Sequence, residues 1–339
     1  MKIYSQKKYN PFSRVRKFFK KNPSYYWKVP GFILLLIVIG CSVKIDSVVQ
    51  PGSITAGDVL PVTLNATIMP NASQTSKFMV AVLVPKVWNA SKNATITFTS
   101  DITTGDQPMS LIPAGTPAPN GNGLDWPTNL LTKIGNGGNL LPDYEWVAFY
   151  SNSSYSVSNG NNFGVVVTIK IKTSLDNVSF KMGYCIAEST DGLSDPQYYS
   201  SNFPGCLTAN GAGDLIDFCN PQLSTVDPRT SLDNDLITVN FDGGVLNNNL
   251  QGASQVYLNI TAYTSTGDSI VVSNPTAATQ MTGLGLNRWQ KDIWPRGFFK
   301  LADNQTLTRL SYFFTDAAGL NKVGYAATSA PFTYTFKCQ

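Results

Sequence analysis

The sequence contains no histidine, and its only glutamates are Glu145 and Glu188. Without histidine, the Ser-His-Asp and Cys-His arrangements and every imidazole-ligated metal site are excluded. A glycosidase needs two carboxyl groups roughly 5–10 Å apart, and no motif here pairs two of them. Glu145 lies in the segment Asp143–Trp146, which fits a strand with one solvated and one core face. We therefore expect no enzymatic activity, no catalytic residue, no metal and no cofactor.

Long apolar runs are also missing at the start of the chain. The run Phe32–Ile39 has 8 residues, whereas a helix that crosses a bilayer needs about 20. A run of this length suits the apolar core of a signal peptide. It follows a leader with nine lysines and arginines and no acid, and it ends in Val38-Ile39-Gly40-Cys41, which resembles a bacterial lipobox.

That resemblance implies that residues 1–40 are a lipoprotein signal peptide and that Cys41 carries the lipid. Acyl chains contribute about 0.8 kcal/mol per buried methylene group, and two or more chains hold a protein durably on a membrane. The membrane is then a partner through lipidated Cys41. The alternative is an uncleaved amphipathic or half-spanning anchor with an incidental cysteine.

Charge is scarce as well, at 14% of residues. Outside the leader the chain has 16 basic and 21 acidic residues, a net charge of −5. A nucleic-acid-binding surface needs clustered lysine and arginine, so we expect no nucleic acid partner. Abundant amide and hydroxyl side chains are typical of an exported β-protein.

Only four cysteines follow Cys41, namely Cys185, Cys206, Cys219 and Cys338. Their spacing gives no zinc pattern, and an exported chain can form disulfides. We favour Cys206–Cys219, because this pair closes a short loop. Cys185 with Cys338 would tie the body to its last strand, and free buried cysteines are the alternative.

Alternating apolar and polar residues predict strands through most of the body, for example over 62–68 and 255–263. Residues 101–125 are rich in Gly, Pro, Asn and Asp and predict a long loop, and residues 126–135 predict a short helix. Two groups of about seven strands, separated by the pattern-poor segment 188–235, predict an all-β fold of two immunoglobulin-like antiparallel β-sandwich domains. We place these domains at residues 41–225, with long loops, and 226–339.

Exposed aromatic side chains are the best candidates for a ligand site, because they stack on the apolar faces of sugar rings. In the segment 287–299, Trp289 and Trp294 fall on opposite faces of one strand, so both cannot lie in the core. We expect Trp294 to be the better ligand platform and Trp289 the second. Trp88 and Trp126 are weaker candidates, and the alternative for each tryptophan is a place in the core or on a sandwich edge.

Several segments together resemble uncharacterised surface lipoproteins of Bacteroidota, and the aromatic strand followed by Asp-x-x-Gly also resembles starch-binding sandwich modules. These segments are 82–88, 287–289, 293–299, 310–319 and 323–325. Proteins of this kind are commonly encoded beside starch-utilisation-type TonB-dependent transporters and their lipoprotein lids. The resemblance implies an accessory role in capturing glycan or peptide at the outer membrane. The family's export signal is acidic, whereas Ser42–Asp46 has one base and one acid, which leaves the surface and periplasmic faces open.

We therefore expect a non-catalytic, lipid-anchored outer-membrane protein that faces the cell exterior and binds polysaccharide for a nutrient-uptake system. The alternative is a structural subunit of an outer-membrane transporter or assembly complex.

Overall fold

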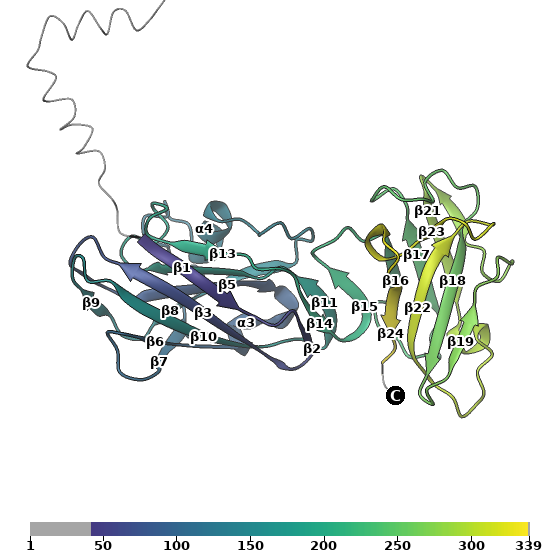
Figure 1. The fold of residues 1–339 in the computed structure, drawn as a ribbon, viewed down its shortest axis with the longest axis horizontal. Coiled ribbons are helices and arrows are strands. Elements are labelled where there is room, and N and C mark those ends of the chain that lie inside the picture. Colours follow the sequence, from purple (N-terminus) through teal and green to yellow (C-terminus); the bar gives the residue numbers. More distant parts are fainter. Residues whose placement is uncertain (1–41, 338–339) are drawn as a thin grey trace, which may run out of the picture. The chain divides into compact units, whose positions relative to one another are not determined.

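The computed structural model describes residues 42–337, and these residues form an all-β fold (Figure 1). The expected signal peptide, the lipid attachment at Cys41, and Cys338 lie outside the described residues. Within residues 42–337, no helix combines the length and the apolar character needed to cross a bilayer.

The strands of the first half and of the segment that follows it are β1 (Ser42–Val49), β2 (Ser53–Thr55), β3 (Val59–Met69), β4 (Gln74–Ser76), β5 (Phe78–Pro85), β6 (Ala94–Ser100), β7 (Gln107–Leu111), β8 (Tyr144–Ser151), β9 (Tyr155–Val157), β10 (Phe163–Lys172), β11 (Asp176–Phe180), β12 (Gly183–Glu188), β13 (Ser200–Asn202), β14 (Leu207–Asn210) and β15 (Ala212–Asp217). The later strands are β16 (Ser224–Asp227), β17 (Ile237–Asp242), β18 (Tyr257–Thr264), β19 (Ser269–Val272), β20 (Thr282–Gly285), β21 (Arg288–Ile293), β22 (Leu307–Thr315), β23 (Lys322–Val323) and β24 (Phe332–Thr335). The helical elements are η1 (Lys86–Trp88), α3 (Ala90–Asn93), α4 (Trp126–Lys133), α5 (Pro295–Phe298) and η2 (Tyr325–Ala327).

The first sandwich is built from one path of hydrogen-bonded strands in the order β1-β3-β10-β6-β7-β8-β5-β12-β13. Strand β3 alternates buried and partly exposed residues, as its sequence predicts, while all eight residues of β5 are buried. The two ends of the path meet, because Ile45 N donates to Ser200 Oγ at 3.0 Å. The path therefore folds back on itself around a single apolar core.

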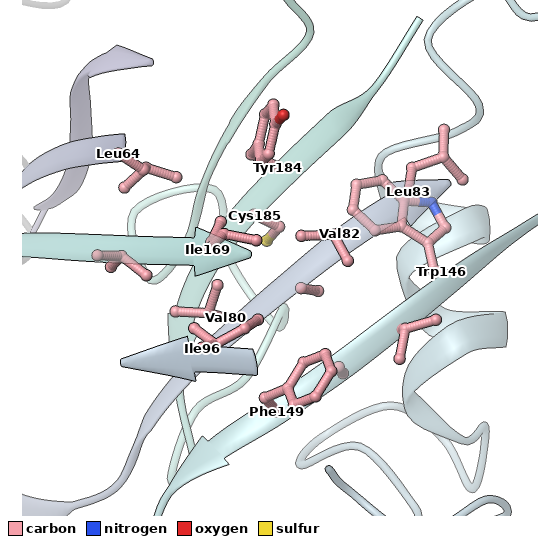
Figure 2. Close-up of a cluster of buried hydrophobic side chains, with 14 of the residues drawn as sticks. Leu64, Val80, Val82, Leu83, Ile96, Trp146, Phe149, Ile169, Tyr184 and Cys185 are labelled. Carbon is pink, nitrogen blue, oxygen red and sulfur yellow. The ribbon is translucent and has the colours of Figure 1, made fainter. Parts of the chain in front are cut away.

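That core contains Cys185, which lies among aliphatic side chains such as Val82 and Ile169 (Figure 2). The Cys185 thiol is free and fully buried, and burial raises its pKa well above the usual value for a thiol. Of the two possibilities considered for Cys185, a bridge to Cys338 and a free buried thiol, the structure has the second, and Cys185 packs as a small apolar side chain in the core.

The predicted helix after the long loop is confirmed as α4. Asp125 caps its N-terminus by accepting a hydrogen bond from Thr128 N at 3.1 Å, and Pro127 lies in its first turn. An oxygen side chain at the N-cap and a proline in the first turn both favour a helix start. The helix begins with the buried Trp126, whose Nε1 donates to Tyr150 Oη of β8 at 3.0 Å.

A second sheet has the order β19-β18-β22-β24-β15-β11-β14-β2, with β23 paired to β22, and a four-stranded sheet has the order β16-β17-β21-β20. The side chains of Phe241 on β17 and Phe314 on β22 stack with their ring centroids 4.4 Å apart, which joins these two sheets in a second core. Most strand pairs are antiparallel, as expected. Two pairs are parallel, namely β11 with β15 and β14 with β2.

Strands β14 and β15 flank β11 on its two sides, and Cys206 and Cys219 lie just outside this pair of strands. The predicted disulfide Cys206–Cys219 is confirmed. The turn between the strands passes close to the start of β11, since a Cβ at Gly211 would lie 2.3 Å from the carbonyl oxygen of Leu175. Only glycine fits this close approach.

Two segments that were expected to lack strands contain them. Strand β7 lies within the predicted loop 101–125, and β13 to β16 lie within the pattern-poor segment 188–235. The sequence of β20, Thr-Gly-Leu-Gly, is typical of a turn between strands. All are short, and β7, β13 and β20 are largely exposed, while β14, β15 and β16 mix buried and partly exposed residues without a long apolar run. They form strands because they are hydrogen-bonded to strands that are distant in the sequence. Alternation of apolar residues does not predict such pairing.

Candidate functional site

The strongest candidate site is the outer surface of the four-stranded sheet. Strands β17 and β21 pair directly, so Thr238 faces Asp292, Asn240 faces Gln290, and Asp242 faces Arg288. The residues between them on β17, Ile237, Val239 and Phe241, are buried in the second core. The six polar residues therefore share the opposite, solvent side of the sheet. We call this surface, together with Trp294, the β17–β21 face.

Trp294 extends this row by one position. It follows β21 directly with an extended backbone, at φ −92° and ψ 103°, so strand alternation places it on the same side as Asp292 and Gln290. Its side chain is 53% exposed. The predicted assignment of Trp294 and Trp289 to opposite faces agrees with the strand register.

The indole ring of Trp294 is held in place from two directions. Its Nε1 donates to Asn234 Oδ1 at 3.2 Å. Its ring lies directly over Gly297 of α5, where an added Cβ would come within 2.3 Å of Trp294 Cε3. A fixed aromatic plane with exposed surface is the arrangement that stacks on an apolar ligand face without losing much side-chain entropy.

The turn that carries Trp294 is anchored by a buried ion pair. Arg296 Nη1 donates to Asp233 Oδ2 at 3.0 Å and to the carbonyl oxygen of Gln305 at 2.9 Å. The same Asp233 oxygen accepts from Leu307 N at 3.0 Å. These contacts fix α5, and with it Gly297, against the rest of the second core.

The polar side chains of the face keep most of their hydrogen-bonding capacity. Thr238 Oγ1 donates to Asp292 Oδ1 at 2.7 Å, which orients that carboxylate. Among residues 42–337, the side chains of Gln290 and Arg288 form no hydrogen bond. A groove of about 320 Å³ lies at the Arg288 end and is lined partly by Asn240, Asp242 and Arg288. The face thus offers donors and acceptors beside one aromatic plane.

Trp289 lies on the inner side of the same sheet. It is opposite the buried Phe241, it is half-buried against the second core, and its ring covers Gly283 at 3.1 Å from a Cβ position there. Trp289 also lines the groove near Arg288. The structure therefore gives Trp289 a packing role at the sandwich edge, which was the alternative considered for it.

The prediction that Trp88 and Trp126 could be ligand platforms is wrong. Their side chains are 1% and 0% exposed, and both belong to the first core. Trp126 ends up inside because it starts an amphipathic helix that packs on β8, whereas loop composition suggested exposure. Trp88 is buried in a single 3-10 turn after β5.

Sequence reasoning missed the polar row along β17 and β21 and the role of Asn234. The signal was present, because polar residues at 238, 240 and 242 alternate with buried apolar ones. Which strand pairs with β17, and in which register, is a long-range property that one sequence does not encode locally. That pairing is what brings the two polar rows together.

The comparisons with known proteins concern family and fold. Residues 43–222 match the model of the domain of unknown function DUF4961, and residues 224–323 match that of the domain of unknown function DUF8578. No curated protein matches the sequence.

Solved structures with weak similarity include a C-terminal domain of the antigen I/II-family protein AspA from Streptococcus pyogenes, at 9% identity over 89% of this chain and 100% of that one, with a TM-score of 0.24. They also include part of the N-terminal region of enterococcal surface protein, at 6% identity over 88% and 95% of the two chains, with a TM-score of 0.28. The sporulation control protein Spo0M from Bacillus subtilis matches at 8% identity over 84% and 83%, with a TM-score of 0.25. The first family model covers more than half of the sequence, and the chain belongs to the DUF4961 family.

Proposed function

We propose that this protein is a non-catalytic, lipid-anchored glycan-binding protein of the outer-membrane surface, accessory to a nutrient-uptake system. The observation that carries the proposal is the exposed, fixed indole of Trp294 in line with the polar side chains of β21. An aromatic plane beside amide, carboxylate and guanidinium groups matches the two surfaces of a sugar, its apolar ring face and its hydroxyl edge.

A glycan chain would lie along β21. Its terminal or internal ring would stack on Trp294, and its hydroxyl groups would bind the side chains of Asp292, Gln290 and Arg288 in turn. From Arg288 to Trp294 the row covers six residue-to-residue steps, or about 20 Å. The length favours an oligosaccharide or polysaccharide over a monosaccharide, because one sugar would contact only one end of the row.

The test is polysaccharide binding by residues 42–339, prepared without lipid, against a panel of soluble and insoluble glycans. Trp294→Ala should abolish binding at an unchanged melting temperature, while Trp294→Phe should retain part of it. Gln290→Ala should weaken binding of long chains more than of short ones. Leu320→Ala, an 84% exposed position outside the face, is the matched control. A folded Trp294→Ala protein that binds as well as wild type would exclude this face.

The membrane anchor rests on the lipobox resemblance at Cys41. The full chain expressed in a Gram-negative host should incorporate radiolabelled fatty acid, and Cys41→Ala should remove the label. Surface exposure would appear as cleavage of the intact cells' protein by added protease. Labelling that persists in Cys41→Ala would reject this attachment site.

A second candidate, a structural subunit of a TonB-dependent transporter or assembly complex with its lipoprotein lid, is favoured by one surface. The loop after β17 meets the turn after β20 through a hydrogen bond from Gly243 N to Asn287 O at 2.8 Å. Val245 of that loop, Leu284 of β20 and Leu286 of that turn are 45%, 50% and 84% exposed. Exposed aliphatic side chains gathered in one place are typical of a protein-binding surface. Purification in mild detergent should retain a partner with wild type and lose it with Leu284→Asp plus Leu286→Asp.

A further inference from the structure

A separate cavity of about 230 Å³ lies beside β15 and β24. Its apolar wall includes Leu215, Pro221, Leu223, Pro331 and Phe332. Its polar wall includes the side chains of Asp214, Asp217, Tyr325 and Ser224. A mostly apolar hollow with a few convergent polar groups is the usual form of a small-molecule site.

The cavity wall is built before any ligand arrives. The Tyr325 hydroxyl donates to Asp217 and accepts from Asn220 Nδ2 at 2.9 Å, which pins the ring. The backbone behind it is folded tightly, since Tyr325 N donates to Ala330 O at 2.7 Å and Gly324 has no room for a Cβ. On the other side, Gln222 Nε2 donates to Leu215 O at 2.6 Å. Little conformational entropy would be lost when a ligand enters.

The carboxylates of Asp217 and Asp214 differ in how many of their hydrogen-bond acceptor positions are already used by the protein. Asp217 Oδ1 accepts from the backbone N–H groups of Cys219 and Asn220 at 2.8 and 3.0 Å, and its Oδ2 accepts from Asn220 Nδ2 and Tyr325. Asp217 is therefore a structural group. Asp214 is 7% exposed, and its carboxylate accepts hydrogen bonds from the backbone N–H groups of Val226, at 3.1 Å, and Leu215. Since a carboxylate offers about four acceptor positions, Asp214 keeps capacity for a ligand.

No cationic side chain lines the cavity: its residues include two aspartates and no lysine or arginine. Arg229 lies near enough to lower the pKa of Asp214, but among residues 42–337 it forms no ion pair with it. Burial of this carboxylate is therefore costly, and a positively charged ligand would offset that cost. A neutral hydroxyl ligand would supply a hydrogen bond but no charge. An anion would be repelled by both aspartates.

We propose that this cavity binds a small organic cation, a primary ammonium on a short apolar body, with the ammonium group paired to Asp214 and the apolar body against Phe332 and Leu223. Trp294 and Gln290 do not line this cavity, so binding of the cation can be tested separately from glycan binding.

The experiment compares two probes of the same shape, n-butylammonium and 1-butanol, by calorimetric titration of residues 42–339 at about pH 8, where Asp214 is mostly ionised. Butylammonium should bind saturably and at least tenfold more tightly than butanol. Asp214→Asn should reduce butylammonium affinity at least tenfold, so that butylammonium and butanol bind the variant with equal affinity. Equal binding of both probes by wild type, or no binding of butylammonium, would overturn the proposal.

A second variant covers the case in which Asp214→Asn does not fold. Thr208→Leu adds volume at a half-exposed position that lines the cavity and leaves Asp214 unchanged. It should weaken butylammonium binding while near-ultraviolet circular dichroism stays that of wild type. Butylammonium binding that survives in folded Thr208→Leu with undiminished affinity would place the probe elsewhere and reject this cavity.

Discussion

The guanidinium group of Arg296 and the carboxylate of Asp233 form an ion pair at 3.0 Å between Nη1 and Oδ2, with only 2% of the Asp233 side chain exposed. Removing one partner of a buried pair leaves an uncompensated charge and costs about 3–5 kcal/mol. Because Leu307 N also donates to Asp233, we expect Arg296→Met to lower the free energy of unfolding by about 3 kcal/mol. Urea denaturation measures this.

The matched control is the exposed pair Lys44–Asp46, whose Nζ and Oδ1 atoms are also 3.0 Å apart. Its side chains are 65% and 36% exposed. Lys44→Met should cost less than about 1 kcal/mol, because solvent screens the pair. Equal losses in the two variants would contradict the argument from burial.

The pH dependence of stability should carry a signature of Asp214. Burial raises the pKa of its carboxyl group from 3.8 to about 7, against smaller lowering effects of the Val226 N–H and Arg229. Tyr312 and Tyr334 also face it. Between these pH values the folded protein holds a proton that the unfolded chain has released, so this contribution to stability is lost as pH rises from about 4 to about 7.

For a raised pKa of this size the loss is of order 4 kcal/mol. Asp214→Asn cannot titrate, so the difference in unfolding free energy between wild type and variant should change with pH in this window and be flat above about pH 8. Parallel pH profiles for the two proteins would show that Asp214 has an ordinary pKa.

Reduction of Cys206–Cys219 should destabilise the protein by about 3 kcal/mol, the value expected for a closed loop of this length; the two cysteines are 13 positions apart. The Cys206→Ala plus Cys219→Ala variant should match the reduced protein in thermal unfolding. Cys185→Ala tests a cysteine without a bridge, and its smaller cost should be independent of reductant. A reductant-insensitive wild type would mean that the bridge contributes nothing.

Gly297→Ala should disturb the proposed glycan site without altering any side chain proposed to contact sugar. The added Cβ would lie 2.3 Å from Trp294 Cε3, so the indole must move. We expect at least tenfold weaker polysaccharide binding and a shifted tryptophan emission spectrum. Gly52→Ala, which meets nothing within 4 Å, should leave both unchanged. A shifted spectrum with intact binding would remove Trp294 from the site.

The two buried tryptophans should differ from each other. Trp126→Phe breaks the bond from Nε1 to Tyr150 Oη, while the Nε1 of Trp88 has no hydrogen-bond partner among the described residues. Leaving a buried group unpaired costs about 1–3 kcal/mol, so Trp126→Phe should cost more stability than Trp88→Phe. Neither change should affect polysaccharide binding, which checks that both side chains are structural.

The local sequence was sufficient to predict strands with alternating apolar and polar residues, a helix with recognisable N-terminal residues, and a short disulfide loop. Val62 to Ile68 alternated as a half-buried strand, Asp125 and Pro127 marked a helix start, and Cys206 and Cys219 bounded a short loop. In each case the deciding interaction lies within a few residues of the chain or in simple periodicity.

The candidate site was only partly predictable. Trp294 could be placed opposite Trp289 by alternation, but the burial of Trp88 and Trp126 depends on strands far away in the sequence. The polar row needs the register of β17 with β21, and the cavity at Asp214 needs β15 beside β24. Pairing of distant strands is a global result of folding, which single-residue patterns do not contain.

The disulfide has a topological consequence. The covalent ring formed by residues 206–219 has β14 as one side and β15 as the other, and β11 is hydrogen-bonded between them. While the disulfide is closed, β14 and β15 stay close to β11 even when the hydrogen bonds of one strand pair break. The closed ring therefore holds together the last strands of the eight-strand path, next to its edge strand β2. In an oxidising compartment a covalent bond secures this edge of the sheet, whereas in a reducing one its hydrogen bonds alone hold it.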